Sequence, residues 1–228
     1  MSQKNKLQKF AEIKTFNNFF EYSYQEILKG FHLKGKWAEK FFKNNNPIVL
    51  ELGCGKGEYT TGLAQRYPEK NFIGIDIKGA RIWRGIKTTE EKNLNNVAFI
   101  RDRVNLVNHY FGKNEISEIW ITFPDPYARD TKARKRLTSP EFIDLYTKFL
   151  RKDAIINLKT DNFIVFESTL DTIDEYNHEI LYQTSDVYNQ GLDNELTQIQ
   201  TFYEKKWLEH GTKIKYLKFS LNSNIFKD

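Results

Sequence analysis

The residues whose types and spacing suggest chemistry lie in one stretch, Glu118 to Arg136, which reads EIWITFPDPYARDTKARKR. It begins as an apolar, β-branched run and stops at Pro124-Asp125-Pro126. The two prolines fix φ on either side of Asp125 and remove two backbone donors, so we expect a carboxylate on a stiff turn at a strand tip. A basic arm follows, and it consists of Arg129, Lys132, Arg134, Lys135 and Arg136. The alternative is a proline turn followed by a solvated run of charges.

A glycine turn follows the apolar run from Pro47 to Leu52, and the chain there reads ELGCGKG from Glu51 to Gly57. Glycines permit a tight turn and a close approach of the backbone to a ligand. The spacing is GxGxG, and Glu58 stands where the dinucleotide fingerprint GxGxxG has its last glycine. A glutamate beside a pyrophosphate disfavours NAD, whereas the adenosine of S-adenosylmethionine carries no phosphate, so the turn favours that cofactor. The alternative is a glycine turn that serves packing only.

Acids end the first strands in succession. Asp76 closes the second predicted strand, where a carboxylate can accept hydrogen bonds from both ribose hydroxyls. Asp102 closes the third, within reach of the adenine amino group, and Glu51 is placed to accept from the cofactor's α-ammonium. A single such acid is usually a solvent-facing strand end, but a succession of them after a glycine turn indicates a cofactor site.

The elements that must position these residues alternate along the chain. Predicted strands cover residues 47–52, 71–77, 97–101, 116–123, 154–159, 180–188 and 213–221. Predicted helices cover residues 58–66, 79–93, 107–110, 163–176 and 196–209, and Ser139-Pro140-Glu141 opens another helix that the serine should cap. Apolar strands separated by helices predict an α/β fold with a mostly parallel, twisted sheet, helices on both faces and an antiparallel edge. Ligands bind such sheets beyond the carboxyl ends of the strands, where the strand order reverses.

The N-terminal part and the composition set the outer bounds. Residues 1 to about 16 are lysine-rich and predict a mobile basic tail, and residues 17–43 predict one or two helices, so we divide the chain into an extension, 1–43, and a domain, 44–228. The net charge of +5 suits an anionic partner such as nucleic acid. One cysteine, Cys54, excludes an internal disulfide. Because no apolar run approaches the roughly 20 residues of a membrane helix and no signal peptide is evident, we expect a soluble, cytoplasmic protein.

Five segments, taken in order, resemble the bacterial tRNA (guanine-N7-)-methyltransferases: ELGCGKG, GIDIKG, FPDP with the basic segment that ends RKRL, LKTDN, and TFYE. The match covers about residues 45 to 220. The resemblance implies a Rossmann-like class I methyltransferase fold in residues 44–228, with S-adenosylmethionine as cofactor and tRNA as partner. It further implies methyl transfer to a guanine in the variable loop of tRNA. Apart from the resemblance, we expect a monomer or homodimer with no membrane and no metal as partner.

The resemblance also assigns roles to residues. Cofactor-contacting positions are Glu51, Asp76, Asp102 and Asp125, to which we add Gly53 and Gly55 of the glycine turn, and Asp125 is also the candidate catalytic residue. Substrate-binding positions are Arg129, Asp161, Thr201, Phe202, Tyr203 and Glu204. We expect Arg134, Lys135 and Arg136, with Lys4, Lys6 and Lys9 joining from the tail, to neutralise tRNA phosphates. For Glu204 the alternative is a solvated charge pair with Lys205 and Lys206.

The chemistry of guanine agrees with these assignments. N7 has an in-plane lone pair, so it attacks a methyl group without losing a proton, and the four histidines are scattered without motif spacing. We hypothesise that Asp125 or Asp161 accepts hydrogen bonds from the donor edge of the base, N1–H and the exocyclic amine. Three alternatives remain: a methyltransferase acting on another RNA, a protein or a small molecule, an NAD-dependent oxidoreductase, and a non-catalytic RNA-binding protein.

Overall fold

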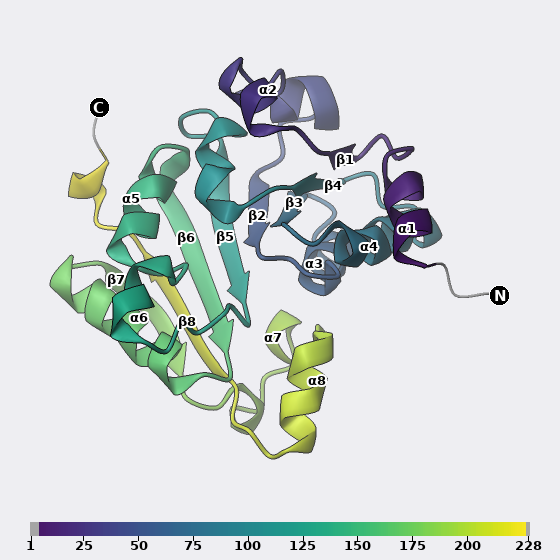
Figure 1. The fold of residues 1–228 in the computed structure, drawn as a ribbon. Coiled ribbons are helices and arrows are strands. Elements are labelled where there is room, and N and C mark those ends of the chain that lie inside the picture. The colour runs from purple at the N-terminus through teal and green to yellow at the C-terminus, as the bar shows by residue number, and fades with distance from the viewer. Residues whose placement is uncertain (1–4, 227–228) are drawn as a thin grey trace.

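The computed structural model describes residues 5–226, and within them eight strands form one mixed sheet (Figure 1). In spatial order the strands are β1 (Phe19–Phe20), β4 (Val97–Arg101), β3 (Asn71–Asp76), β2 (Ile48–Leu52), β5 (Ile116–Thr122), β6 (Leu150–Thr160), β8 (Lys215–Ser220) and β7 (Glu179–Thr184). The first six are parallel, and β8 is antiparallel to both of its neighbours. The predicted α/β fold, parallel with an antiparallel edge, is confirmed.

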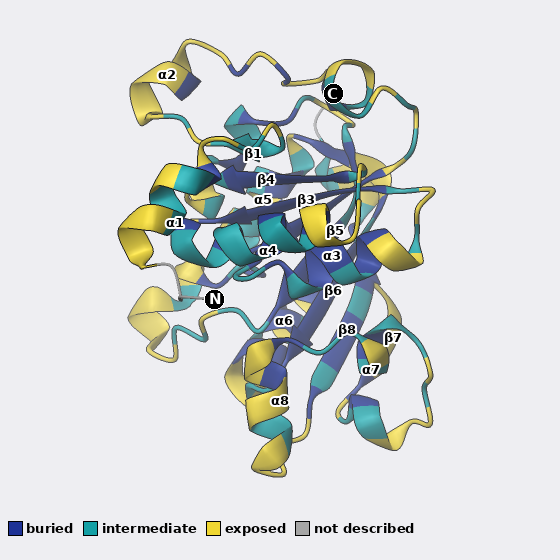
Figure 2. Cartoon of the chain, turned by 90° about the vertical axis from the view of Figure 1, so that its right-hand side faces the viewer, coloured by how far each residue is buried: buried dark blue, intermediate teal, exposed yellow. Residues whose placement is uncertain are grey.

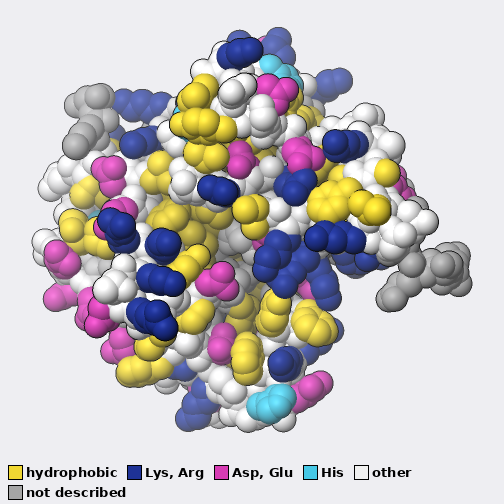
Figure 3. Space-filling model, in the orientation of Figure 1, with side chains coloured by type: hydrophobic (Ala, Val, Ile, Leu, Met, Phe, Trp, Pro, Cys, Tyr) yellow, Lys and Arg dark blue, Asp and Glu magenta, His cyan; other side chains and the backbone are white. Residues whose placement is uncertain are grey.

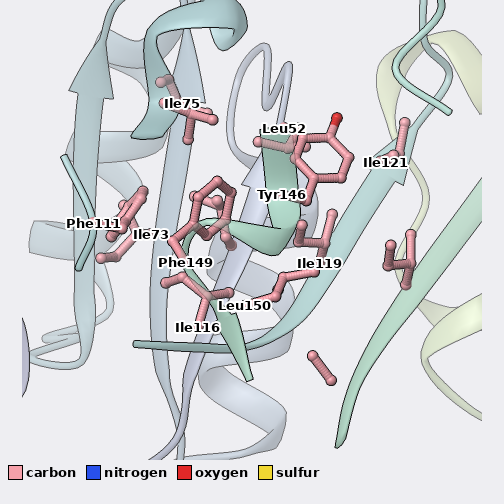
Figure 4. Close-up of a cluster of buried hydrophobic side chains, with 14 of the residues drawn as sticks. Leu52, Ile73, Ile75, Phe111, Ile116, Ile119, Ile121, Tyr146, Phe149 and Leu150 are labelled. Atoms are coloured by element: carbon pink, nitrogen blue, oxygen red, sulfur yellow. The ribbon is translucent and has the colours of Figure 1, made fainter. Parts of the chain in front are cut away.

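Helices cover both faces of this sheet, and each face has its own buried apolar cluster. One cluster includes side chains of α1 (Lys6–Ile13), α3 (Glu58–Arg66), α4 (Gly79–Glu91), η4 (Val187–Asn189), α7 (Glu195–Gln198) and α8 (Phe202–Glu209). The other includes side chains of α2 (Tyr24–Leu28), η1 (Trp37–Phe42), η2 (Val104–His109), α5 (Pro140–Thr147), α6 (Phe163–Glu175) and η5 (Ser223–Ile225). In this second cluster Tyr146 and Phe149 lie against Leu52, Ile119 and Ile121 of the central strands (Figure 4).

The central strands are buried on both faces, which explains why they could be recognised. Every residue of β2 and β3 is buried (Figure 2). A strand that packs against helices on both sides is a continuous apolar run, not an alternating one. Glu51 interrupts the run in β2, so its carboxylate needs partners inside the protein.

The N-terminal segment differs from the mobile tail that its composition predicts. Asn5 and Gln8 form a reciprocal capping box, with both hydrogen bonds at 2.9 Å, and α1 begins there. Ile13 is fully buried, and the Trp83 indole N–H donates to Glu12 at 2.7 Å. The tail prediction is therefore wrong for residues 6–13, because a helix of eight residues is too short to give a recognisable period. Lys4 lies outside the described residues.

Two other elements differ from their predictions. Phe19 and Phe20 pair with β4 inside a region predicted to be helical, since a two-residue strand leaves no pattern in the sequence. The single helix predicted for residues 196–209 is two helices, because Ile199 is extended and Thr201 starts α8 by accepting the Glu204 N–H at 3.1 Å. The division of the chain at residue 43 stays a prediction.

The strand order reverses between β2 and β5. From β2 the chain passes outward to β3 and β4, and it then returns to β5 on the other side of β2. Leu52 at the end of β2 pairs with Ile121 near the end of β5. The glycine turn and the Pro124-Asp125-Pro126 loop therefore leave neighbouring strand ends, which is where ligands bind such sheets.

Candidate active site

The glycine turn after β2 has a left-handed backbone that only glycine adopts without strain. The φ angles of Gly53, Gly55 and Gly57 are 73°, 57° and 70°. A Cβ atom on Gly53 or Gly55 would meet nothing within 4 Å, whereas one on Gly57 would lie 2.8 Å from the Phe99 ring. Gly57 therefore serves packing, and the other two leave open space in which a ligand can approach the main chain.

Glu51 lies beneath this turn with only 3% of its surface exposed. Its carboxylate accepts the Thr60 N–H at 2.8 Å, the Thr60 hydroxyl, and the Thr122 hydroxyl at 3.0 Å. Burial raises the pKa of Glu51 to about 7, against the effect of these hydrogen bonds. Glu51 thus joins β2 to the first turn of α3 and to the end of β5, and its predicted contact with the cofactor's ammonium stays a prediction.

Asp76 and Asp102 are hydrogen-bonded at the ends of β3 and β4. Asp76 accepts the Gly55 N–H at 2.9 Å and the Lys78 N–H at 2.7 Å, each on a different oxygen. Asp102 accepts the Tyr110 hydroxyl at 2.7 Å. Each carboxylate oxygen has a second lone pair, so both residues can still accept from a ligand. Open backbone at the glycine turn and two such carboxylates fit a nucleoside with ribose hydroxyls and an amino group.

The loop after β5 is strained and braced. Phe123 and Tyr127, on either side of Pro124-Asp125-Pro126, have positive φ angles of 50° and 41°. Such angles are costly for non-glycine residues and persist only where the surroundings impose them. The Arg136 guanidinium donates to the carbonyl oxygens of Pro126 and Tyr127, both at 3.2 Å. The hydrogen bonds from Arg136 therefore hold the loop in one conformation.

Asp125 at the centre of this loop is exposed, and among residues 5–226 its carboxylate has no hydrogen-bond or ion-pair partner. Glu51, Asp76 and Asp102 all have such partners. Of the four acids predicted to contact the cofactor, Asp125 alone presents a carboxylate that no described residue engages.

The basic arm divides into exposed and buried members. Arg129, Arg134 and Lys135, in and just before η3 (Asp130–Lys135), are exposed, whereas Arg136 is 8% exposed and bonded to the loop. The structure thus places Arg136 with the scaffold and not with the exposed cations. Ser139 precedes α5 as predicted, but the predicted cap is wrong: its hydroxyl donates to the Arg134 carbonyl at 3.1 Å and caps no helix N–H.

Asp161 follows the end of β6 on the same edge of the sheet and is partly buried. Burial raises the pKa of the Asp161 carboxyl, and Lys215 opposes that rise. The Lys215 ammonium donates to the Asp161 main-chain oxygen at 3.2 Å, so it leaves the carboxylate itself available.

The TFYE segment forms the start of α8 and presents two aromatic rings. Phe202 and Tyr203 are 55% and 42% exposed. The Lys56 ammonium, from the glycine turn, lies 4.1 Å from the centre of the Phe202 ring. Arg81 of α4 donates to the Tyr203 hydroxyl at 2.8 Å. These contacts set the segment beside the predicted cofactor site.

Glu204, in contrast, is fully buried. Its carboxylate forms an ion pair with Lys159 and accepts the Tyr188 hydroxyl at 2.7 Å. The alternative of a solvated charge pair with Lys205 and Lys206 is therefore wrong. Burial lowers the pKa of Lys159 to about 8, although Glu204 opposes the shift. Lys159 is not among the functional residues predicted from the sequence, although a lysine inside the apolar strand run INLKT was an available signal.

Direct contacts bring the predicted segments together. Glu51 joins β2 to β5, and Asp76 joins β3 to the glycine turn. The Phe123 N–H donates to the Lys159 carbonyl at 2.8 Å, and the Phe202 N–H donates to Glu58 at 3.3 Å. Within residues 5–226, no hydrogen bond or ion pair joins the side chains of Arg129, Arg134 and Lys135 to these segments.

Charges are unevenly distributed around the site. On the face shown in Figure 3, Lys and Arg side chains gather in two groups, one over the region of η3 and one over the region of α4, and acidic and apolar side chains lie between them. Both groups lie on one face, so a single anionic chain can contact both of them.

Two features are absent from residues 5–226. No helix there has both the length and the apolar content to cross a membrane. No three His, Cys, Asp or Glu side chains in that part of the chain are arranged to hold a metal ion.

The sequence is similar to known methyltransferases over most of its length. A family model described as "Putative methyltransferase" matches residues 45–217. The tRNA (guanine-N(7)-)-methyltransferase of Christiangramia forsetii is 51% identical over 223 residues, which are 97% of this chain and 100% of that protein. The enzymes of the same name from Bacteroides fragilis and Clostridium acetobutylicum are 47% and 38% identical, over 96% and 81% of this chain and 86% and 85% of theirs.

Solved structures agree in fold. A 16S rRNA methyltransferase, KamB, superposes with a TM-score of 0.63 at 14% identity, covering 81% of this chain and 92% of that one. A geranyl diphosphate C-methyltransferase from Streptomyces coelicolor A3(2) superposes with a TM-score of 0.51 at 12% identity, covering 87% and 77%. At such identities the likeness shows the fold alone, which is that of a Rossmann-like class I methyltransferase.

Proposed function

Since this chain belongs to the tRNA (guanine-N(7)-)-methyltransferase family, we propose that it transfers the methyl group of S-adenosylmethionine to N7 of a guanine in the variable loop of tRNA. The observation that carries the residue assignment is the exposed, unpartnered Asp125 carboxylate on a braced loop, at the point where the strand order reverses. The protein acts in the cytoplasm, as a monomer or a homodimer.

The attack of N7 on the methyl group requires no general base from the protein. S-adenosylmethionine supplies a methyl group made electrophilic by its sulfonium. The N7 lone pair lies in the plane of guanine, so no proton must leave before attack. The protein's contribution is alignment of the two reactants and a field that favours the positive charge on the methylated ring.

The glycine turn and the strand-end acids hold the cofactor. Gly53 and Gly55 let it approach the main chain, since neither has neighbours within 4 Å of a Cβ position. Asp76 accepts from the ribose hydroxyls and Asp102 from the adenine amino group, each with the lone pairs that its protein bonds leave. Glu51 keeps the turn in place from below.

Asp125 and Asp161 face the guanine. N7 and O6 of the base are acceptors, so a carboxylate cannot bind that edge. It can accept from N1–H and the exocyclic amine, which adenine does not present in the same pattern. We assign this contact first to Asp125, because its carboxylate is exposed and has no partner among residues 5–226, whereas Asp161 is partly buried. Asp125 also lies nearer the glycine turn in the sheet order, since β5 and not β6 adjoins β2.

Exposed cations and aromatics bind the rest of the tRNA. Arg129, Arg134 and Lys135 neutralise phosphates, and Phe202 and Tyr203 offer rings on which bases stack. Arg136 and Glu204, both buried, contribute by holding the Asp125 loop and the start of α8.

The test is methyl incorporation from radiolabelled S-adenosylmethionine into unmodified tRNA, followed by aniline cleavage at N7-methylguanine. We expect cleavage in the variable loop with the wild type, and a loss of about 10²- to 10³-fold in kcat with Asp125→Asn. Asp130→Asn, which removes an exposed acid five residues further along, should retain the wild-type rate.

Other outcomes would move the assignment. Cofactor binding without label in tRNA keeps the fold and moves the substrate to another RNA, a protein or a small molecule. A full rate with Asp125→Asn leaves the activity in place and contradicts the role of Asp125.

A further inference from the structure

Lys159 is a fully buried lysine one residue before the end of β6. A buried ammonium is costly unless it is paired and hydrogen-bonded, so lysine is rarely without exposed surface. An apolar side chain would serve the sheet equally well here, as Leu158 does on the other face. The charge therefore has a use beyond forming the strand.

The three N–H donors of this ammonium all have acceptors. They are the Glu204 carboxylate, the Leu196 carbonyl, and the Tyr59 hydroxyl at 2.8 Å. The acceptors come from α8, α7 and α3. One side chain thus fixes three helices to the end of β6.

The main chain of Lys159 contacts the residue that precedes the Pro124-Asp125-Pro126 loop. Its carbonyl accepts the Phe123 N–H at 2.8 Å, and Phe123 is the first strained residue before Asp125. Asp161 lies two residues after Lys159, just beyond the end of β6. A single residue of the LKTDN segment therefore contacts both the FPDP segment, through Phe123, and the TFYE segment, through Glu204.

We propose that Lys159 is a positioning residue for the methyl transfer: its ammonium holds the TFYE segment, through Glu204, against the strand that also positions Asp125 and Asp161. This proposal rests on the proposed function. The ammonium itself has no exposed surface and does not touch the substrate. It acts because Glu204 is the third residue of α8 and completes its capping box, so a fixed Glu204 fixes Phe202 and Tyr203 at the rim of the site.

Side-chain and main-chain roles of Lys159 predict a split in kinetics. Lys159→Met removes the cation and leaves Glu204 buried without it, but the carbonyl that holds Phe123 stays. We expect the KM for tRNA to rise at least about tenfold, with kcat and the Kd of S-adenosylmethionine each within about threefold of the wild type. Glu204→Gln should raise the KM in the same direction.

Ile156→Ala is the matched control. Ile156 is fully buried on the same strand, with its side chain in the cluster on the opposite face, so its truncation costs stability without touching Glu204. It should leave the KM for tRNA unchanged at a temperature where both variants are folded. Hydrogen exchange adds a readout that needs no activity: amides of residues 202–209 should exchange faster in Lys159→Met and at the wild-type rate in Ile156→Ala.

If Lys159→Met does not fold, Tyr188→Phe gives the same test more mildly, because it removes only the hydroxyl that donates to Glu204. An unchanged KM and unchanged exchange in α8 would overturn the proposal, and so would an equal rise in KM with Ile156→Ala. If the wild type leaves tRNA unmethylated, the proposed function fails, and the exchange rates alone decide whether Lys159 holds α8.

Discussion

Two carboxylates at neighbouring strand ends, Glu51 on β2 and Asp125 after β5, have opposite surroundings. Glu51 is 3% exposed and accepts three hydrogen bonds from Thr60 and Thr122. Asp125 is exposed and, within residues 5–226, unpartnered. Both lie at the edge where ligands bind, so position along the sheet does not separate their roles. Their hydrogen-bond partners do separate the two roles. A carboxylate that is hydrogen-bonded within the fold stabilises the site, and one without such partners can bind a substrate.

Keeping Asp125 free depends on the loop that carries it. Left-handed φ angles at Phe123 and Tyr127 cost about 1–3 kcal/mol each, which the native surroundings must offset. The flanking prolines remove donors that could have bonded the carboxylate, and Arg136 bonds the loop carbonyls instead of the acid. The buried acid is thus stabilised by its own bonds, and the free one by the bonds of its neighbours.

The strongest test of this difference between Asp125 and Glu51 is to remove the exposed Asp125 carboxylate. Asp125→Ala should lower kcat by about 10²- to 10³-fold, because it removes an interaction made with the reacting base. The melting temperature should stay within about 1 °C of the wild type, because the side chain has no partner to lose. Steady-state methylation and thermal melting check this. A large fall in melting temperature would show that Asp125 is structural, like Glu51.

Substitution of Arg136 tests whether its hydrogen bonds to the loop carbonyls are needed for catalysis, as the Asp125 carboxylate is. Arg136→Met keeps the length of the side chain but removes both bonds to the loop carbonyls, so the loop should relax and kcat should fall about 10- to 100-fold. Arg134→Met, in the same arm but exposed, should keep kcat at saturating tRNA. Equal losses of kcat in the two variants would contradict the separate role of Arg136.

Sequence patterns predicted the fold wherever burial produced a strong pattern. The apolar runs of β2, β3 and β5 and the antiparallel edge are confirmed, since strands covered on both faces have continuous apolar sequences. The short elements were not predictable: α1 has eight residues and β1 has two, and neither is long enough for a period.

The site was predictable by position but not by environment. Strand ends placed Asp76, Asp102 and Asp125 on one edge, as expected from a parallel sheet. The burial of Arg136 and Glu204 was not predictable, because each stands beside exposed cations in the sequence and finds its partners far along the chain or in a strained turn. Charge runs identify a surface, but they do not tell which member of the run faces inward.

The pH dependence of the unfolding free energy tests the structural role of the buried Glu51. Its pKa is raised to about 7 in the fold, so its contribution to stability is fully present below the unfolded value near 4.5 and is lost as the pH rises through 7. Between pH 5 and 8 the wild type should lose about 2 kcal/mol of unfolding free energy relative to Glu51→Gln. Urea unfolding of both proteins without added cofactor measures this. Parallel pH profiles would mean that Glu51 titrates normally.

A further test concerns the exposed cations of the basic arm, which we expect to bind tRNA phosphates. Arg134→Ala/Lys135→Ala removes two exposed charges, so tRNA binding at about 0.1 M salt should weaken about tenfold, and the slope of log K against log salt should shrink by about 2. Filter binding over a salt series measures both. Lys113→Ala/Lys148→Ala is the matched control, since it removes two exposed lysines at the amino ends of β5 and β6. The same change of slope in both double variants would mean that only net charge matters. A change confined to the first would show that phosphates meet the arm at the edge where Asp125 is free, which ties the two exposed features to one substrate.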